Sequence, residues 1–440
     1  MKSNRNLLRL LPVASALAAS LATAGTLQDI YNQSTAAAAP GAADWNLKAA
    51  EQNVQTQRMR YLPKLSLIAR ELWVYQDIRQ SGTTVFQNGH DSYDSTRLNV
   101  IVDQPIYDPT ISPLVEASKA RKRQAEILDR DAREAETRQL VEGFVDTARF
   151  QALIASCDRV IARLEKELDS VSKSHDAKIA TVTDVQNIRL ALAAVKRERN
   201  SFNDRLAYSL GLLGDSAERL KTPGVRLSPD ADPASISAGA SASARTPAAE
   251  LVTAEAAEIG HQATATQRRS LPVLSLYSQW GQDNAGGSEF GGARDLSNYE
   301  VGLAVRWDIF DRGMNYSEAR ELKYRQHAKE AELRALAATS GRTDQRGRQL
   351  VEQAASAEAD LADLVKQHEI LRDASARAYD AGKESYLNSI NAYLSYESTL
   401  REWVNARHDR VQSQAASQAR ASGWDSALVQ KVDALFVAAN

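Results

Sequence analysis

The sequence predicts a mainly α-helical protein built twice from one unit, with two long helices and a pair of short strands in each unit. Three observations predict this fold. A hexapeptide recurs about 200 residues further along the chain, long stretches without proline are rich in Ala, Glu, Arg and Leu, and four short runs alternate apolar with polar residues. Self-similarity on this scale decides an architecture, and the two kinds of run give the type of each element.

The repeat extends beyond the hexapeptide. "LPKLSL" begins at Leu62 and "LPVLSL" begins at Leu271, and each is followed by a polar stretch, a second apolar run and an aromatic-Asp turn. The first turn is Pro-Ile-Tyr-Asp at 105–108 and the second is Asp-Ile-Phe-Asp at 308–311. A recent duplication of an ordinary globular domain is the alternative, but the units look too elongated for it.

Composition and charge agree with long helices. The chain has 440 residues, of which 43% are apolar, 6% aromatic and 25% charged. Its formal net charge of −2 leaves no excess of Lys and Arg to neutralise phosphates, so we expect no nucleic-acid partner. The single cysteine, Cys157, belongs to a series of apolar residues spaced by three and four, which predicts a packed helix seam.

The first 24 residues read as a signal peptide. Lys2, Arg5 and Arg9 precede an apolar stretch, and the small residues Ala22 and Ala24 stand at the positions that a signal peptidase reads. We therefore expect export from the cytoplasm with cleavage after Ala24. No cysteine stands directly after the cleavage site to carry a lipid anchor. No later apolar run is long enough for a transmembrane helix, so the remaining route into a membrane is a closed β-barrel.

Four runs have the pattern of membrane strands. Between Tyr299 and Asp308 apolar and polar residues alternate, and the run from Leu98 repeats this with one exception. Runs from Leu65 and Leu274 are less regular and end near aromatic residues. A pair of soluble hairpins is the alternative. Because four strands are too few to close a barrel, the chain would share one with its own copies, and a cyclic trimer supplies twelve strands.

The rest of the chain reads as helix. Apolar seams with charged flanks predict coiled-coil pairs, Ser112–Ser172 with Asp184–Gly211 and Tyr316–Tyr379 with Asn388–Ser422. The domains expected are a signal peptide (1–24), a first repeat (25–221), a linker (222–247), a second repeat (248–422) and a C-terminal tail (423–440).

The sequence resembles the TolC family of outer-membrane export ducts. The likeness rests on the duplicated layout, the repeated strand starts, "TVTDVQNIRLAL" from Thr181 and "AYDAGKESYLNSINAYLS" from Ala378, and it covers about Leu27 to Ser422. It implies a homotrimer with a shared twelve-stranded barrel in the outer membrane of a Gram-negative bacterium and an α-helical barrel in the periplasm. The implied partners are outer-membrane lipid, a periplasmic adaptor and an inner-membrane ABC, RND or MFS transporter. No cofactor or metal is implied.

The resemblance also implies a gate at the periplasmic tip. Asp184 falls on the family's gate-locking carboxylate, and Tyr379 falls on the tyrosine that bonds to it from the neighbouring helix pair. Glu384 stands where well-known members have an arginine, and Asn388 and Asn391 stand where they have pore-constricting aspartates. For each of these residues, the alternative is a solvated turn position.

The two helix turns at the tip are the expected docking surface for the adaptor. Gly382 and Ser385 lie in the second turn. In the first turn, Lys178 replaces the glycine that the family prefers, so we expect a different backbone there. Type I protein secretion and multidrug efflux are the two alternatives for the cargo.

Two other classes of protein explain less of the sequence. An enzyme would need convergent titratable groups, but the six histidines lie apart and show no metal-ligand or triad spacing, so no catalytic activity is expected. A periplasmic coiled-coil adaptor or scaffold is the stronger alternative. It leaves the paired amphipathic strands unexplained.

Overall fold

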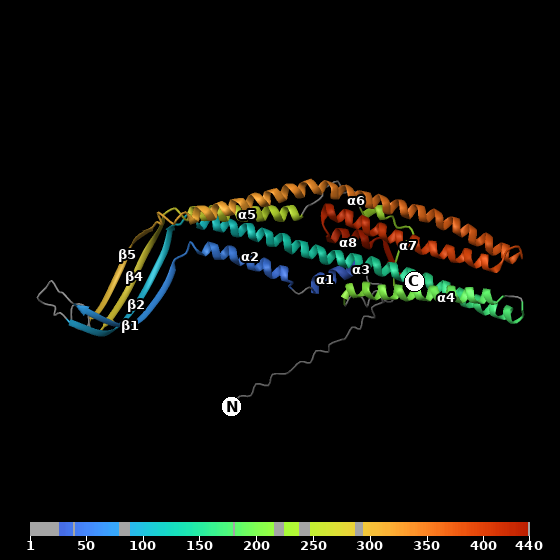
Figure 1. Ribbon diagram of the computed structural model, residues 1–440, viewed down its shortest axis with the longest axis horizontal. Helices are drawn as coiled ribbons and strands as arrows, with labels where there is room; N and C mark the ends of the chain where they lie inside the picture. Colours follow the sequence, from blue (N-terminus) through green and yellow to red (C-terminus); the bar gives the residue numbers. More distant parts are fainter. Residues whose placement is uncertain are drawn as a thin grey trace, which may run out of the picture. The chain divides into compact units, whose positions relative to one another are not determined.

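The structure is a computed structural model that describes residues 26–37, 40–78, 89–178, 181–214, 224–236, 247–286 and 294–438. The predicted signal peptide lies outside these residues. The helices are α1 (Leu27–Ala37), α2 (Ala42–Met59), α3 (Ile111–Asp176), α4 (Val182–Leu212), α5 (Pro247–Arg268), α6 (Met314–Asp380), α7 (Tyr386–Ser422) and α8 (Ser426–Asp433), with a 3₁₀ turn at Pro233–Ile236. The strands are β1 (Lys64–Ile78), β2 (Gly89–Tyr107), β3 (Val225–Leu227), β4 (Val273–Ala285), β5 (Arg294–Arg306) and β6 (Phe436–Ala438) (Figure 1).

The four long helices are confirmed, each with ends within four residues of those predicted. Both aromatic-Asp turns cap the helix that follows them. Asp108 accepts hydrogen bonds from the N–H and hydroxyl of Thr110 ahead of α3, and Asp311 accepts from the N–H groups of Gly313 and Asn315 ahead of α6. These bonds satisfy backbone donors that a helix start leaves without partners, which explains why the turn is repeated.

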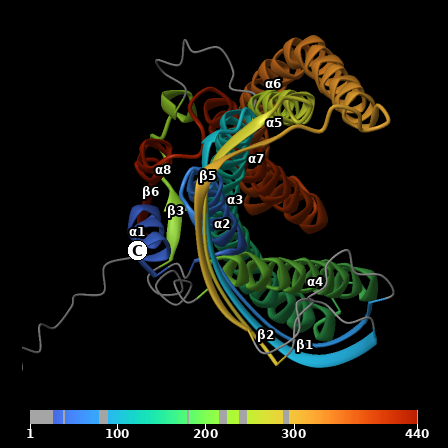
Figure 2. The same cartoon turned by 90° about the vertical axis from the view of Figure 1, so that its left-hand side faces the viewer.

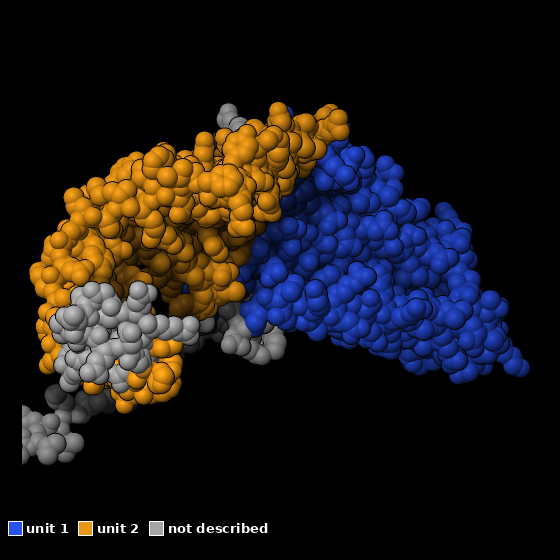
Figure 3. Space-filling view, turned by 60° about the vertical axis from the view of Figure 1, so that its left-hand side comes forward, with its two compact units in different colours: residues 1–37, 134–244, 346–440 blue, residues 38–133, 245–345 orange. Residues whose placement is uncertain are grey.

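The chain forms two compact units, and α3 and α6 contribute to both. Unit 1 comprises residues 1–37, 134–244 and 346–440, and unit 2 comprises residues 38–133 and 245–345 (Figure 3). Each unit draws on both sequence repeats, because equivalent segments of the two repeats pack together.

Unit 2 contains an antiparallel sheet of four strands in the order β1-β2-β4-β5. The two hairpins lie side by side and pair through β2 and β4 (Figures 1 and 2). The strands extend into the polar stretches 76–95 and 282–298 that follow the hexapeptides: β1 runs to Ile78, β2 begins at Gly89, β4 runs to Ala285 and β5 begins at Arg294. Ladder pairing extends the strands into residues that have little strand preference of their own.

One face of this sheet is apolar and exposed. Leu67 pairs with Val100, Val100 with Trp280, and Trp280 with Tyr299, so one row of partners crosses all four strands on one face. The predicted alternation is therefore confirmed in its register. The exposed large apolar side chains of this face are Leu65, Leu67, Trp73, Tyr75, Leu276, Trp280, Tyr299, Val301, Leu303 and Val305.

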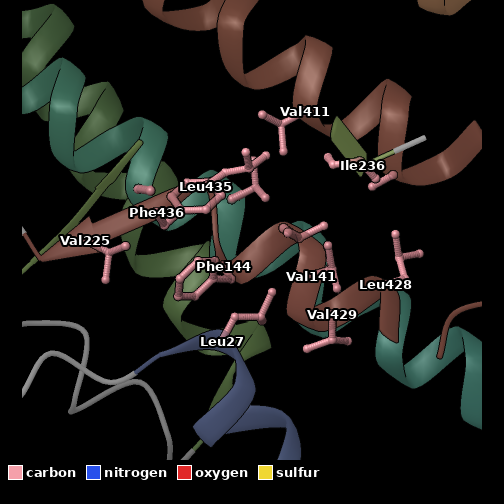
Figure 4. Close-up of a cluster of buried hydrophobic side chains, with 14 of the residues drawn as sticks. Leu27, Val141, Phe144, Val225, Ile236, Val411, Leu428, Val429, Leu435 and Phe436 are labelled. Carbon is pink, nitrogen blue, oxygen red and sulfur yellow. The ribbon is translucent and has the colours of Figure 1, made fainter. Parts of the chain in front are cut away.

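The first core of unit 1 lies where the two ends of the described chain meet α3 and α7. Leu27 of α1, Phe144 of α3, Val411 of α7 and Val429 of α8 are buried together, and Phe144 meets Phe436 edge to face with ring centroids 5.1 Å apart (Figure 4). The segment predicted as a C-terminal tail thus forms α8 and β6.

The predicted linker also contains structure, because β3 pairs with β6. Arg407 of α7 holds the segment after β3 by donating hydrogen bonds to the carbonyl oxygens of Ser228, Pro229 and Ala231. The domain boundaries drawn from the sequence nevertheless stay predictions.

The second core of unit 1 joins α3, α4 and α7. Cys157 is fully buried there with Leu164, Ile188 and Tyr393, which confirms the predicted seam. Burial raises the pKa of the Cys157 thiol, which keeps it in its unreactive protonated form. Within the described residues, no helix is both long and apolar enough to cross a bilayer.

Candidate functional site

The predicted tip consists of the turns α3–α4 and α6–α7. In the second turn Gly382 has φ 68°, its N–H donates to the carbonyl of Tyr379 at 2.9 Å, and the N–H of Lys383 donates to that of Ala378 at 2.8 Å. This pair of bonds is a Schellman motif, in which a left-handed residue ends the helix.

Lys178 follows α3 with the same left-handed backbone. Its φ is 61° and its N–H donates to the carbonyl of His175 at 2.8 Å, which matches the bond made by Gly382. At residue 178 itself the backbone has the left-handed conformation of Gly382, and the expected difference from the family's turn stays a prediction. The end of the helix requires the left-handed conformation at residue 178, where a side chain raises the conformational energy of the folded chain.

The left-handed conformation of Lys178 and Gly382 leads to a prediction about stability. Lys178→Gly should raise the free energy of unfolding by about 1 kcal/mol, and Gly382→Ala should lower it by a similar amount. Nothing lies within 4 Å of a Cβ placed on Gly382, so the loss would be conformational rather than steric. Chemical unfolding followed by circular dichroism measures both changes, and shifts of the same sign would contradict the account.

Both helices after the turns begin with a side-chain cap. The hydroxyl of Thr181 accepts the N–H of Asp184, and the Asp184 carboxylate accepts the N–H and hydroxyl of Thr181 at 2.9 and 2.7 Å. This capping box lowers the pKa of the Asp184 carboxyl. Ser385 accepts the N–H of Asn388 at 3.3 Å and caps α7.

The structure does not bring the two predicted lock residues together within one chain. Asp184 bonds to its own cap, and the Tyr379 ring lies edge to face with Tyr386 at 5.6 Å between centroids. Among the described residues no hydrogen bond joins Asp184 to Tyr379. The lock therefore stays a prediction.

The other predicted tip residues lie in the second turn and at the start of α7. Glu384 is partly buried and accepts a hydrogen bond from the buried hydroxyl of Ser375 in α6. Asn388 and Asn391 are exposed one helical turn apart on α7. That spacing puts both amides on one side of the helix. Whether copies of them meet in a pore stays a prediction.

The contacts that hold α7 against α3 were not predicted from the sequence. Tyr386 donates to Glu167 at 2.9 Å, and the guanidinium of Arg163 lies 4.3 Å from the ring centroid of Tyr393. Burial, with the nearby Glu167 carboxylate, raises the pKa of Tyr386, so its hydroxyl stays a donor. The seven-residue spacing of the two tyrosines was the available signal.

Further along α7, two buried or partly buried polar contacts continue this packing. The hydroxyl of Ser156 donates to Glu397 at 2.9 Å, and the Nη2 atom of Arg401 lies 3.2 Å from a carboxylate oxygen of Glu198 in α4. Polar contacts of this kind fix which faces of the helices meet. The described residues contain no group of three or more His, Cys, Asp or Glu side chains that could hold a metal ion.

Comparison with known proteins identifies the fold. No protein-family model matches the chain, and no curated protein matches its sequence. Among solved structures, the outer-membrane channel OprN is 16% identical, with 91% of this chain and 90% of that one covered and a TM-score of 0.72. The outer membrane protein VceC from Vibrio cholerae is also 16% identical, with 90% and 95% covered and a TM-score of 0.71. The MtrE outer membrane channel of Neisseria gonorrhoeae is 12% identical, with 91% and 90% covered and a TM-score of 0.68. The chain therefore has the fold of the TolC family of outer-membrane channels, as its sequence predicted.

Proposed function

We propose that the chain is one subunit of a passive, homotrimeric export duct in the outer membrane. The observation that supports this best is the four-stranded sheet of unit 2, which has an exposed apolar face and two open edges, β1 and β5. Unpaired strand edges cannot face lipid, because each backbone group without a partner costs several kcal/mol there. Three copies joined edge to edge would close the sheet, and its apolar face would then meet the lipid.

Cell fractionation tests this proposal. An outer-membrane duct should sediment with the outer membrane and need detergent for extraction, whereas a periplasmic adaptor or scaffold would be released by osmotic shock. Release by osmotic shock would refute the proposal.

The tip turns would face the periplasm and dock an adaptor, which in turn would connect the duct to an inner-membrane transporter. The exposed turn at Gly382 offers the surface for this contact.

The orientation makes a labelling prediction. A cysteine in place of Gly286, at the loop end of β4, should react with an impermeant maleimide on intact cells. A cysteine in place of Lys383 should react only after the outer membrane is opened. Lys383 is exposed and, unlike Ser385, caps no helix, so its substitution should leave α7 intact. Exchanged reactivities would invert the proposed orientation.

The asparagines of α7 make a conductance prediction. If Asn388 and Asn391 line the closed tip, the pore has neutral rings and little trivalent-cation block in planar bilayers. Asn388→Asp with Asn391→Asp should introduce strong block, because carboxylates held close in a narrow pore bind multivalent cations. An aspartate at 388 also suits the first turn of a helix, so folding should persist.

Glu384 is the control for this experiment. Its carboxylate, bonded to Ser375, could supply a negative field of its own. Tight block of the unmodified channel that survives Glu384→Gln would mean that the constriction lies elsewhere.

A further inference from the structure

The polar face of the sheet carries charges at its open edges that form no ion pair among the described residues, and Arg70 and Glu300 are two of them. Arg70 lies on β1, and among the described residues no ion pair forms to it. Its cross-strand partner is Arg97, and like charges placed opposite each other are unfavourable. Arg97 is compensated on its other side by Asp283, 3.4 Å away, so Arg70 is left as the excess cation of this row.

The opposite edge carries the complementary charge. Glu300 lies on β5 opposite Gln279, and within the described part of the chain it accepts an amide hydrogen bond from Asn298 at 3.2 Å but forms no ion pair. Glu300 lies in the row of paired residues Glu300–Gln279–Ile101–Ser66. Arg70 lies on the same face, two rows from Ser66 towards the loop end of β1. Both side chains are exposed in the single chain.

Closure of a barrel shifts one edge along the other. Four strands spaced about 4.8 Å apart span about 19 Å, and a strand tilt of about 35–45° turns this width into a stagger of about 13–19 Å. At about 3.3 Å per residue the stagger is four to six residues. It must be an even number, because an odd shift would exchange the apolar and polar faces.

The hand of the barrel sets the direction of the shift. Figure 2 shows the curved sheet from the loop end of its strands, with β1 at one end of the curve and β5 at the other. With the right-handed tilt of β-barrels, the row that leaves β5 meets the next copy further along β1, towards its loop end.

The row of Glu300 therefore moves from Ser66 towards Arg70 of the next copy. A stagger of four residues puts Glu300 directly opposite Arg70, and a stagger of six leaves Arg70 as its diagonal neighbour. A diagonal neighbour at about 7–8 Å is still within reach of a long side chain. We propose that Arg70 of each copy pairs with Glu300 of the next copy on the inner face of the barrel, and that this pair sets the register of the contact between subunits. The inference rests on the proposed trimeric barrel.

Charge reversal tests the pair. Arg70→Glu and Glu300→Arg should each lower the temperature at which the detergent-solubilised trimer dissociates, and the double variant should recover most of the loss. The trimer fraction is followed by size-exclusion chromatography with light scattering after stepwise heating. Arg70→Gln and Glu300→Gln provide milder variants if a reversed charge prevents assembly.

A matched control uses the pair that lies within one chain. Arg97→Glu should be rescued by Asp283→Arg, and Arg70→Glu should not be. Two results would overturn the inference while leaving the trimer in place: single variants as stable as the unmodified trimer, or a double variant no better than the singles. An unmodified protein that runs as a monomer would instead refute the proposed function.

Discussion

Leu303→Arg should sharply reduce the amount of folded protein in the outer membrane. Leu303 lies on the apolar face of β5, opposite Leu276, and 68% of its surface is exposed in the single chain. An arginine on the lipid side of a barrel costs up to about 2–4 kcal/mol near mid-membrane and less towards the interfaces. Heat-dissociable trimer in purified outer membranes, measured against total protein, gives the loss.

Ala304→Arg is the matched control, because its side chain lies on the polar face one residue away and pairs with Ser275. It should insert nearly as well as the unmodified chain. If both arginines are tolerated, or if Ala304→Arg is the more harmful, the assignment of the lipid-facing side is wrong.

Acidification should destabilise the protein through His408. This residue is 3% exposed in α7, and its Nδ1 atom lies 2.7 Å from the carbonyl oxygen of Val404. Burial, with repulsion from Arg149 and Arg407, lowers the pKa of His408 to about 4. Since an unfolded histidine titrates near about 6.5, the unfolded chain binds more protons here between these two pH values.

Stability from His408 is therefore constant above about pH 6.5 and falls as the pH drops towards 4, by about 3 kcal/mol in all. Unfolding midpoints measured in detergent between pH 7.5 and 4.5 should fall more steeply for the unmodified chain than for His408→Phe. Because both proteins contain the same carboxylates, the contribution of these groups to the pH dependence cancels when the two slopes are compared. Parallel slopes would show that His408 is not buried as a neutral ring.

The long helices could be predicted because their signals are local. Capping residues such as Asp108 and Asp311, a left-handed glycine at 382 and unbroken apolar seams between them all lie in the sequence itself. The Cys157 seam follows from spacing alone. Each of these features acts within a few turns of one helix.

The missed elements depend on partners far away in the chain. β3 and β6 are three residues each and exist because they pair with one another across about 200 residues. The polar first half of β2, from Gly89, is a strand because β1 and then β4 lie beside it. For α8, by contrast, a local signal was overlooked, since Leu428, Val429 and Val432 already have helical spacing.

The sequence located the two helix turns that are proposed as the tip, but it could not say what their residues touch. Ser385 and Asp184 proved to belong to helix caps, and Glu384 to a bond with Ser375. The contact between Tyr386 and Glu167 joins residues 219 positions apart, so the spacing of Tyr386 and Tyr393 could indicate a packed face of α7 but not its partner.

The native mass of the protein extracted from outer membranes in mild detergent tests the central claim most directly. In the proposed duct, the four described strands of each chain leave two open edges, which copies of the same chain would have to close in lipid. The account predicts one species with the mass of three mature chains. A monomer in the same detergent, with its helical signal intact, would contradict it.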